Sequence, residues 1–548
     1  MQRRIALLLL VLILAAAGWH CRRLYPDGLA AGDEALTALR SLGLMEQGRW
    51  WTPYWNGAPD LHKPPLYYGL AAAGFRLFGV GTFALRLPAM TAYLLLIVLA
   101  YALGRRLFDP WTGLAASALT ALHPTLAAQA CVGMMDTTMI AFSLGAACLL
   151  LKADETPRAL TGWGACCGLA LLTKGEAAVP ILLASLLYVA AFRRRFFCAP
   201  CFYGGLLLAA LLPGIWFGSQ FILHRELFLK PHYADIKDYR LRHSWRDAAL
   251  FLKSLRHLWA SWGGVAPLLF GAPLLVTGEA WWRRRHTPAR PEAGRGGLVA
   301  GREFVLIALA GLVPMILISL VRQQMSWYML PAVVPMAIFA AQVVRSLAGP
   351  GYPPILRLAA CLLLAAGTRL PGAFSGPKAL PWLVCAAAAA GAMLALARRP
   401  RVRIAGGAAF HLGLALALAG GLSAANPRVN RFAYRHSGDM RELAGHLPPA
   451  DIIPGPFVAN FRHFPLNSLM FYARRDSLQL RPFSKTPLPA GRQLAGVLVG
   501  GGCREFLRGV EVQSLTNFAG YEIILIRNAT PGSVVPAEVR ASGEAVVR

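Results

Sequence analysis

Acidic residues are scarce in this chain of 548 residues. Aspartate and glutamate number 26 against 55 lysines and arginines, which gives a formal net charge of +29, and only 15% of the residues are charged. Apolar residues make up 56% of the chain, and its mean hydropathy is +0.49. So low a charge content excludes an ordinary soluble domain and is typical of an integral membrane protein.

The chain also has little lysine and no disulfide framework. Only 8 of its basic residues are lysines and 47 are arginines, a bias that either phosphate recognition or a GC-rich genome would produce. Most of the 10 cysteines lie in apolar runs, where cysteine behaves as a small hydrophobic residue. In so apolar a chain, the positive charge favours anionic lipid over nucleic acid as the partner.

Apolar runs long enough to cross a bilayer follow one another along the chain. Arginine clusters, among them Arg3-Arg4, Arg105-Arg106 and Arg193 to Arg195, fall at every second junction between these runs. Because cytoplasmic loops retain arginine, those junctions and the N-terminus are predicted to be cytoplasmic. We expect about 13 transmembrane helices, at 5–21, 84–104, 111–129, 137–152, 159–173, 177–192, 202–221, 262–280, 303–321, 328–345, 355–371, 379–397 and 404–422.

An odd number of spans places the C-terminus on the far side of the membrane. Two loops, at 22–83 and 222–261, and the tail at 423–548 are then exported. The first span also has the features of a cleavable signal peptide, and in either form it exports the loop that follows. The predicted fold is an α-helical polytopic membrane protein, with its transmembrane region at 1–422.

The tail at 423–548 differs in composition from the rest of the chain. It is punctuated by proline and glycine and contains short β-rich runs at 494–499 and 521–526. This pattern predicts a small α/β domain outside the membrane.

No aspartate or glutamate lies in the middle of a predicted span. The acids that approach the membrane are Asp33, Glu34, Asp136 and Glu176, all at the exported ends of helices. Ion-coupled transporters usually keep ionisable groups deep in the membrane. The placement therefore favours chemistry at the outer membrane interface over transport across it.

The first exported loop carries the most informative motif. Lys63 lies between His62 and the pair Pro64-Pro65, which restricts the backbone, and two tyrosines follow. A rigidly held cation beside an aromatic belt is suited to binding a lipid phosphate. For the acids Asp33 and Glu34, the simpler alternative is a solvated helix N-terminus, where negative charge is favourable.

Several motifs together resemble a known family. They are Asp33-Glu34, Thr52-Pro53, the run His62-Lys63-Pro64-Pro65-Leu66-Tyr67-Tyr68, Met135-Asp136, Leu172-Thr173-Lys174-Gly175 and Tyr328-Met329-Leu330-Pro331. The chain resembles, over roughly residues 1 to 345, the GT-C membrane glycosyltransferases, and most closely family 39. That family holds bacterial aminoarabinose transferases acting on lipid A and protein O-mannosyltransferases. Two positions depart from its pattern: Trp327 stands where arginine is expected, and Glu176 where proline is frequent.

The resemblance implies a GT-C fold and an inverting glycosyltransferase in the bacterial inner membrane. The donor would be a sugar on a polyprenyl phosphate such as undecaprenyl phosphate, used on the periplasmic side. The basic exported face favours an anionic acceptor, lipid A or another envelope glycolipid, over protein hydroxyl groups. A lipid-linked sugar transporter and a catalytically silent scaffold are the alternatives from other classes.

Three groups of residues would carry the reaction. Asp33, Glu34 and Asp136 are the candidate catalytic acids, with Asp33 orienting or deprotonating the acceptor. Helix capping is the competing explanation for Asp136. Lys63, Arg86 and Arg322 are predicted to bind the donor phosphate, although both arginines would also suit simple snorkelling to the interface. Tyr67, Tyr68 and Tyr328 would line the lipid cavity.

The histidines raise the question of a metal ion. His62 in the first exported loop and His232 and His243 in the second are the candidate ligands for zinc, without the tight spacing of a structural site. No cofactor is firmly indicated. The second loop also carries a basic strip that suits either a phosphorylated acceptor or a segment lying on the lipid surface.

Overall fold

The computed structural model describes residues 2–24, 28–29, 33–55, 58–234, 256, 302–319 and 326–348 and the strands at 451–453, 494–499, 511–518 and 521–527. The chain divides into two compact units. The first, the bundle unit, comprises residues 1–24, 61–67 and 86–427, and the second comprises residues 25–60, 68–85 and 428–548.

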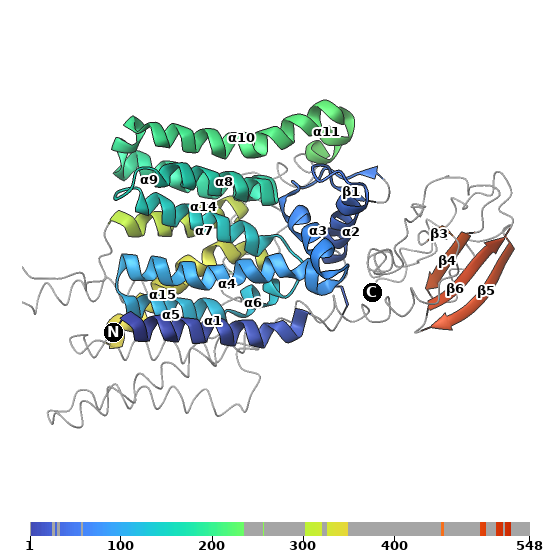
Figure 1. Cartoon of the computed structure of the whole chain (residues 1–548), viewed down its shortest axis with the longest axis horizontal. Helices are drawn as coiled ribbons and strands as arrows, with labels where there is room; N and C mark the ends of the chain where they lie inside the picture. Colours follow the sequence, from blue (N-terminus) through green and yellow to red (C-terminus); the bar gives the residue numbers. More distant parts are fainter. Residues whose placement is uncertain are drawn as a thin grey trace, which may run out of the picture. The chain divides into compact units, whose positions relative to one another are not determined.

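Helices make up most of the described part of the bundle unit (Figure 1). Helix α8 packs against α7 and α10, α9 packs against α14, and α5 packs against both α1 and α15. The helices are α1 (Gln2–Leu24), α4 (Thr82–Leu107, in this unit from Arg86), α5 (Pro110–Leu122), α6 (Pro124–Ala130), α7 (Asp136–Lys152), α8 (Ala159–Lys174), α9 (Val179–Phe192), α10 (Pro200–Leu223), α11 (Arg225–Ala234), α14 (Arg302–Ser319) and α15 (Val333–Ala348), with 3₁₀ turns η1 (Gly175–Ala178), η2 (Arg194–Cys198) and η5 (Ser326–Ala332).

The apolar runs predicted most of these helices. The predicted spans 84–104, 137–152, 159–173 and 202–221 each coincide with one helix, α4, α7, α8 and α10. In the described part of the chain, three helical stretches are long and apolar enough to cross a membrane: Thr82–Leu107, Ala159–Phe192 and Pro200–Leu223. The predicted spans at 262–280, 355–371, 379–397 and 404–422 lie outside the described residues.

The prediction of one helix over 111–129 was wrong. Helix α5 ends at Leu122, and α6 begins at Pro124. Proline lacks the N–H that a continuous helix needs, and Nδ1 of His123 accepts a hydrogen bond of 3.3 Å from the Leu126 N–H, capping the second helix. The break escapes an analysis based on hydropathy because the apolar run continues through it.

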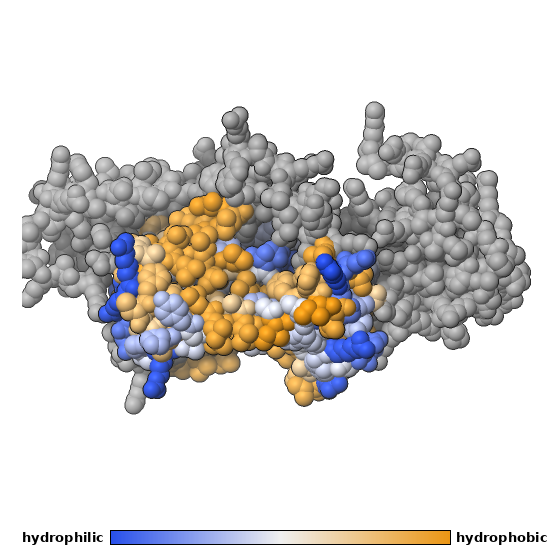
Figure 2. Space-filling model, turned by 90° about the horizontal axis from the view of Figure 1, so that it is seen from above, coloured by the Kyte–Doolittle hydropathy of each residue, from blue (hydrophilic) through white to orange (hydrophobic). Residues whose placement is uncertain are grey.

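Helices α8 and α10 approach until their backbones touch. A Cβ atom on Gly164 would lie 1.8 Å from the carbonyl oxygen of Gly205, so both positions require glycine. The far side of α10 exposes large apolar residues, including Leu207 and Ile222. Figure 2 shows a broad apolar surface over the described helices, with hydrophilic residues at its left-hand end, as expected of a surface that faces lipid.

The described parts of the second unit are helical near the N-terminus and β-structured near the C-terminus. The loop predicted to be the first exported one forms α2 (Asp33–Glu46), a short pair of strands β1 (Tyr54–Trp55) and β2 (Ala58–Pro59), and α3 (Leu66–Phe78, in this unit from Tyr68). The tail contains β3 (Asp451–Ile453), β4 (Leu494–Val499), β5 (Glu511–Phe518) and β6 (Tyr521–Arg527).

These four tail strands form one sheet in the order β3-β4-β6-β5. Strand β3 is parallel to β4, and the other pairs are antiparallel, with a register shift between Ser514 and Thr516. The two β-rich runs read from the sequence coincide with β4 and β6. The two runs are therefore strands, as their composition predicts, whereas the small α/β domain stays a prediction.

Candidate functional site

Asp136 and Lys174 form a nearly buried ion pair at the predicted exported end of the bundle. Asp136 is the first residue of α7 and Lys174 is the last of α8, so the antiparallel packing of these helices brings them together. Nζ of Lys174 donates to Oδ1 of Asp136. The side chain of Lys174 is 12% exposed and that of Asp136 is 4% exposed, which leaves little room for water around the two charges.

The second carboxylate oxygen of Asp136 has no hydrogen-bond partner among the described residues. Helix α7 has no side-chain cap, so the carboxylate does not act in the capping role that the sequence left open. A buried anionic oxygen is costly to leave unpaired. It is therefore available to accept a hydrogen bond from a bound hydroxyl or amine.

A third motif contributes Tyr328 to the same place. Tyr328 lies in η5, and Nζ of Lys174 stands 5.4 Å from the centroid of its ring, within the range of a cation–π contact. Asp136, Lys174 and Tyr328 come from three motifs far apart in the sequence. Their convergence marks this point as the candidate site.

Gly175 turns the chain so that Glu176 reaches a different partner from that of Lys174. Gly175 has a φ of 58°, in the region that favours glycine, and a Cβ there would lie 3.7 Å from the ring of Pro64. Beyond the turn, the carboxylate of Glu176 lies 3.5 Å from Nζ of Lys63. The two side chains are 41% and 27% exposed, so this contact is far more open to solvent than the Asp136–Lys174 pair.

An apolar cluster adjoins both lysines in the sequence. Leu61 precedes Lys63 by two residues and Leu172 precedes Lys174 by two. Both leucines pack with Trp216 and Phe228, and Leu66 and Phe217 lie against this core. The aromatic rings meet edge to face, with Trp216 and Phe217 centroids 4.9 Å apart. The segments that carry the two lysines thus also contribute residues to one apolar cluster.

The candidate acids of the first exported loop occupy two environments in the second unit. Asp33 begins α2 and is exposed, whereas Glu34 is buried. Thr37 donates to the Asp33 carbonyl oxygen at 2.7 Å, one turn further along. Arg40 follows on the same face at a spacing of seven residues.

Arg40 is the centre of a buried polar group in this unit. Its guanidinium donates to Oδ2 of Asp60 at 2.6 and 2.8 Å and to the hydroxyl of Tyr68 at 3.0 Å. Burial raises the pKa of Tyr68 to about 12, although the Arg40 charge acts in the opposite direction. Burial alone would lower the pKa of Arg40, but Tyr68 and Asp60 together raise it above its usual value. The guanidinium is therefore charged at any physiological pH.

The remaining predicted residues are distributed as follows. Arg86 in α4 is 1% exposed, which does not fit simple snorkelling to an interface, and Tyr67 is completely buried. His62 is exposed. His232 falls within α11, but its side chain, like all of Arg322 and His243, lies outside what the structure describes. In the described ranges, no group of three histidine, cysteine or acidic side chains could hold a metal ion.

Two residues of the site were not among the predicted functional residues. Lys174 was recognised only as part of a motif, and Glu176 only as an acid near the membrane and a departure from the family pattern, yet each pairs with a predicted site residue. The signal that would have found Lys174 is the rarity of lysine, of which this chain has only 8 residues.

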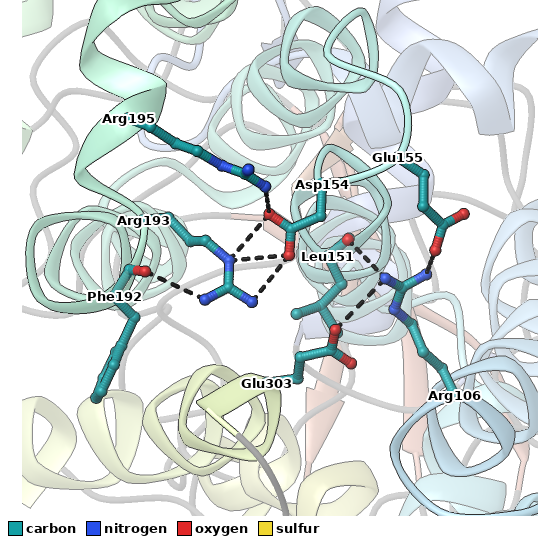
Figure 3. Close-up of polar contacts among 8 residues, drawn as sticks. All are labelled: Arg106, Leu151, Asp154, Glu155, Phe192, Arg193, Arg195 and Glu303. Atoms are coloured by element: carbon teal, nitrogen blue, oxygen red, sulfur yellow. Dashed lines mark hydrogen bonds and ion pairs between the residues drawn. The ribbon is translucent and has the colours of Figure 1, made fainter.

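A second charged network lies at the other end of the same helices (Figure 3). Arg106, in the last turn of α4, contacts Glu155 at 2.8 Å, Glu303 at 3.5 Å and the Leu151 carbonyl oxygen at 2.9 Å. Asp154 accepts from both Arg193 and Arg195, with N–O distances between 2.6 and 2.9 Å. We call this the arginine network. It ties together the ends of α4, α7, α9 and α14.

Comparison with known proteins supports the resemblance read from the motifs. The family described as dolichyl-phosphate-mannose-protein mannosyltransferase matches residues 62–216. An undecaprenyl phosphate-alpha-4-amino-4-deoxy-L-arabinose arabinosyl transferase of Pseudomonas aeruginosa is 30% identical over 343 residues, which are 60% of this chain and 58% of that protein. A similarly named protein of Edwardsiella ictaluri is 25% identical over 329 residues, 58% of this chain and 56% of that one.

The fold has a counterpart among solved structures. The crystal structure of ArnT from Cupriavidus metallidurans bound to undecaprenyl phosphate matches with a TM-score of 0.63 and 18% identity, covering 94% of this chain and 97% of that one. The chain therefore has the mostly helical fold of that protein, which is of the GT-C type. In sequence it resembles the bacterial aminoarabinose transferases, with matched regions that span less than two thirds of those relatives, and the resemblance predicted from its motifs is confirmed.

Proposed function

We propose that this protein is an inverting glycosyltransferase that moves a sugar from an undecaprenyl phosphate carrier to an acceptor on the periplasmic side of the bacterial inner membrane. The acceptor is lipid A or another anionic envelope glycolipid. The observation that carries the proposal is that Lys63 and Lys174 each pair with a carboxylate, and that their motifs also contribute Leu61 and Leu172 to one apolar cluster. A phosphate on a polyprenyl chain needs cations and apolar surface together. The name and bound lipid of the ArnT relative support it.

The reaction assigns a separate task to each charged group. Lys63 holds the donor phosphate, and Asp136, fixed by Lys174, turns its unpaired oxygen to the sugar. Asp33 orients the acceptor, or takes its proton where the acceptor is a hydroxyl group. The acceptor oxygen bonds to the anomeric carbon as the carbon–oxygen bond to the phosphate breaks. The electron pair of that bond goes to the phosphate, whose charge Lys63 stabilises.

The proposed topology follows the arginine clusters. About 13 helices span the inner membrane within residues 1–422, and the loops at 22–83 and 222–261 and the α/β domain at 423–548 lie in the periplasm. The described helices support this arrangement, because Arg106 and Arg193 lie at one end of the bundle and Asp136 and Glu176 at the other.

A protein O-glycosyltransferase is the second candidate, favoured by the description of the matching family. It would use the same donor site and differ only in its acceptor. A lipid-linked sugar transporter is less well supported, since none of the described apolar helices carries an acid away from its ends.

Mass spectrometry of lipid A and of polyprenyl-phosphate lipids tests the proposal. Cells lacking the gene are compared with cells complemented by the wild type, by Asp33→Asn, or by Glu155→Gln, a control in the arginine network. We expect one lipid A species to lose a fixed sugar mass. Wild type and Glu155→Gln restore it, whereas Asp33→Asn, present in the membrane in equal amount, does not.

The other outcomes discriminate between the candidates. Unchanged lipid A with accumulation of a glycosylated carrier lipid would move the acceptor to proteins or other glycans. If neither lipid pool changes, the protein is not a transferase of this kind.

A further inference from the structure

Among the site residues that the structure describes, Glu176 is the carboxylate that contacts a cation still open to solvent. Lys174 is committed to the nearly buried Asp136, whereas the 3.5 Å contact between Glu176 and Lys63 leaves both groups partly exposed. Exposed ion pairs of this kind are worth little and exchange readily. A phosphate that binds Lys63 must therefore share this cation with Glu176 or displace it.

The charges of the four paired side chains cancel. Lys63 and Lys174 contribute two positive charges, and Asp136 and Glu176 two negative ones. In the family pattern, proline is frequent at position 176. With proline there, the remaining side chains, Lys63, Lys174 and Asp136, would carry one net positive charge and would attract every phosphate more strongly. Glu176 must consequently weaken phosphate binding, and the physical question is which phosphate it weakens most.

The two lipid phosphates of the proposed reaction differ in charge. The donor is a phosphodiester with one negative charge. Breaking the bond to the sugar leaves a phosphomonoester, whose second pKa near 6 gives it close to two negative charges at pH 7.5. A phosphate bound to Lys63 would lie within about 6 Å of the Glu176 carboxylate, given the 3.5 Å contact between the two side chains. The repulsion then acts once on the donor and twice on the product.

We propose that Glu176 is a specificity-determining residue that selects the lipid phosphodiester over the lipid phosphomonoester and so promotes release of the spent carrier. This inference rests on the proposed function, because it assumes that Lys63 receives the carrier phosphate. At a separation of about 6 Å with water-like screening, each ligand charge is worth about a threefold change in affinity. Glu176→Gln should tighten the diester about threefold and the monoester roughly tenfold.

The test compares two ligands that share one tail. Full-length protein in lipid nanodiscs is titrated at pH 7.5 with undecaprenyl phosphate and with its methyl diester, and dissociation constants are measured by native mass spectrometry. The wild type is compared with Glu176→Gln, with Glu176→Asp, which keeps the charge, and with Glu155→Gln, which removes a carboxylate from the arginine network. We expect the ratio of diester to monoester dissociation constants to rise about threefold in Glu176→Gln and to stay at the wild-type value in the other two.

Each further result has a distinct meaning. A ratio that is unchanged in Glu176→Gln, or that falls, overturns the inference even if both ligands bind tightly. Equal changes in Glu155→Gln overturn it as well, because the effect would then be one of overall charge. Failure of the wild type to bind either lipid, or undiminished binding by Lys63→Met, would overturn the proposed function itself. Thermal unfolding of each variant verifies that folding is intact, as expected for a side chain that is 41% exposed.

Discussion

The two ends of the helices α7, α8 and α9 hold their charges in different ways. At one end, lysines meet carboxylates one to one, and one oxygen of Asp136 remains unpaired among the described residues. At the other end, Asp154 receives two arginines, and Arg106 contacts two carboxylates and a carbonyl oxygen. About 25 Å of helix separates them.

The difference follows from the chemistry of the two cations. A guanidinium presents several donors in a fixed plane and can hold several acceptors at once, whereas an ammonium is a compact charge on a flexible stem. The arginine network is therefore suited to fastening helix ends together. At the lysine end, which holds Lys63 and Lys174, the partly exposed Lys63–Glu176 pair can exchange its partner for a ligand, whereas Lys174 keeps the nearly buried Asp136 in place.

Lys174→Met should give the largest effect, because it removes the cation of the Asp136–Lys174 ion pair. It leaves the Asp136 carboxylate buried without its cation, at a cost of about 3–5 kcal/mol in the free energy of unfolding. The double variant Lys174→Met/Asp136→Leu should recover most of the thermal stability but none of the transferase activity. Recovery of activity by the double variant would contradict the assigned role of Asp136.

Lys63→Met should separate function from stability. The side chain is partly exposed and its pairing with Glu176 contributes little to folding, so the melting temperature should remain within about 1 °C of the wild type. Transfer from the lipid donor should fall about a hundredfold, as for removal of other groups that stabilise developing charge. Activity assays with purified protein, matched to thermal scans, measure both. A loss of stability equal to that of Lys174→Met would remove the distinction between the two lysines.

Asp154→Asn should show the opposite pattern at the arginine network. Two arginines lose their charged acceptor, and we expect a cost of about 2 kcal/mol in the free energy of unfolding, reduced from the buried case because Arg195 is exposed. Affinity for undecaprenyl phosphate per folded molecule should be unchanged. The pair of measurements is thermal unfolding and lipid titration, and weakened lipid binding would show that the two ends are coupled.

Tyr68→Phe should give the smallest effect and extends the comparison to the arginine centre of the second unit. Because the pKa of Tyr68 is raised to about 12, the folded state keeps a proton that the unfolded state loses from about pH 10 upward. The stability contributed below pH 10 is thus lost as the pH rises towards 12. Between pH 10 and 12 the free energy of unfolding should fall less steeply with pH in Tyr68→Phe than in the wild type, by about 1.4 kcal/mol per pH unit at most. Thermal unfolding at several pH values measures both slopes. Identical slopes would refute the raised pKa of Tyr68.

Hydropathy and arginine placement predict the helices well, because lipid exposure imposes apolar composition on every span. They fail where a break costs no hydropathy, as between α5 and α6, where Pro124 and the His123 cap interrupt one apolar run. The tail sheet was predicted at β4 and β6 from their β-rich composition, whereas β5, Glu511–Phe518, is too polar to stand out.

The candidate site was only partly accessible to sequence analysis. The family resemblance predicts Lys63 and Asp136 as site residues, but no spacing rule links positions 136, 174 and 328. Their meeting depends on antiparallel helix packing, which emerges only in three dimensions. The role of Glu176 was similarly hidden, since its partner Lys63 is more than a hundred residues away.

The glycine contact between α8 and α10 has a mechanical consequence. Where two backbones touch at Gly164 and Gly205, no side chain is present that could change rotamer and absorb a displacement. We therefore expect α10, whose outer face is apolar and exposed, to carry α8 with it when the surrounding lipid changes in length. Lys174 stands at the end of α8. Bilayer thickness thereby becomes an input to the geometry of the site, and membranes of different acyl chain length are not equivalent surroundings for this protein.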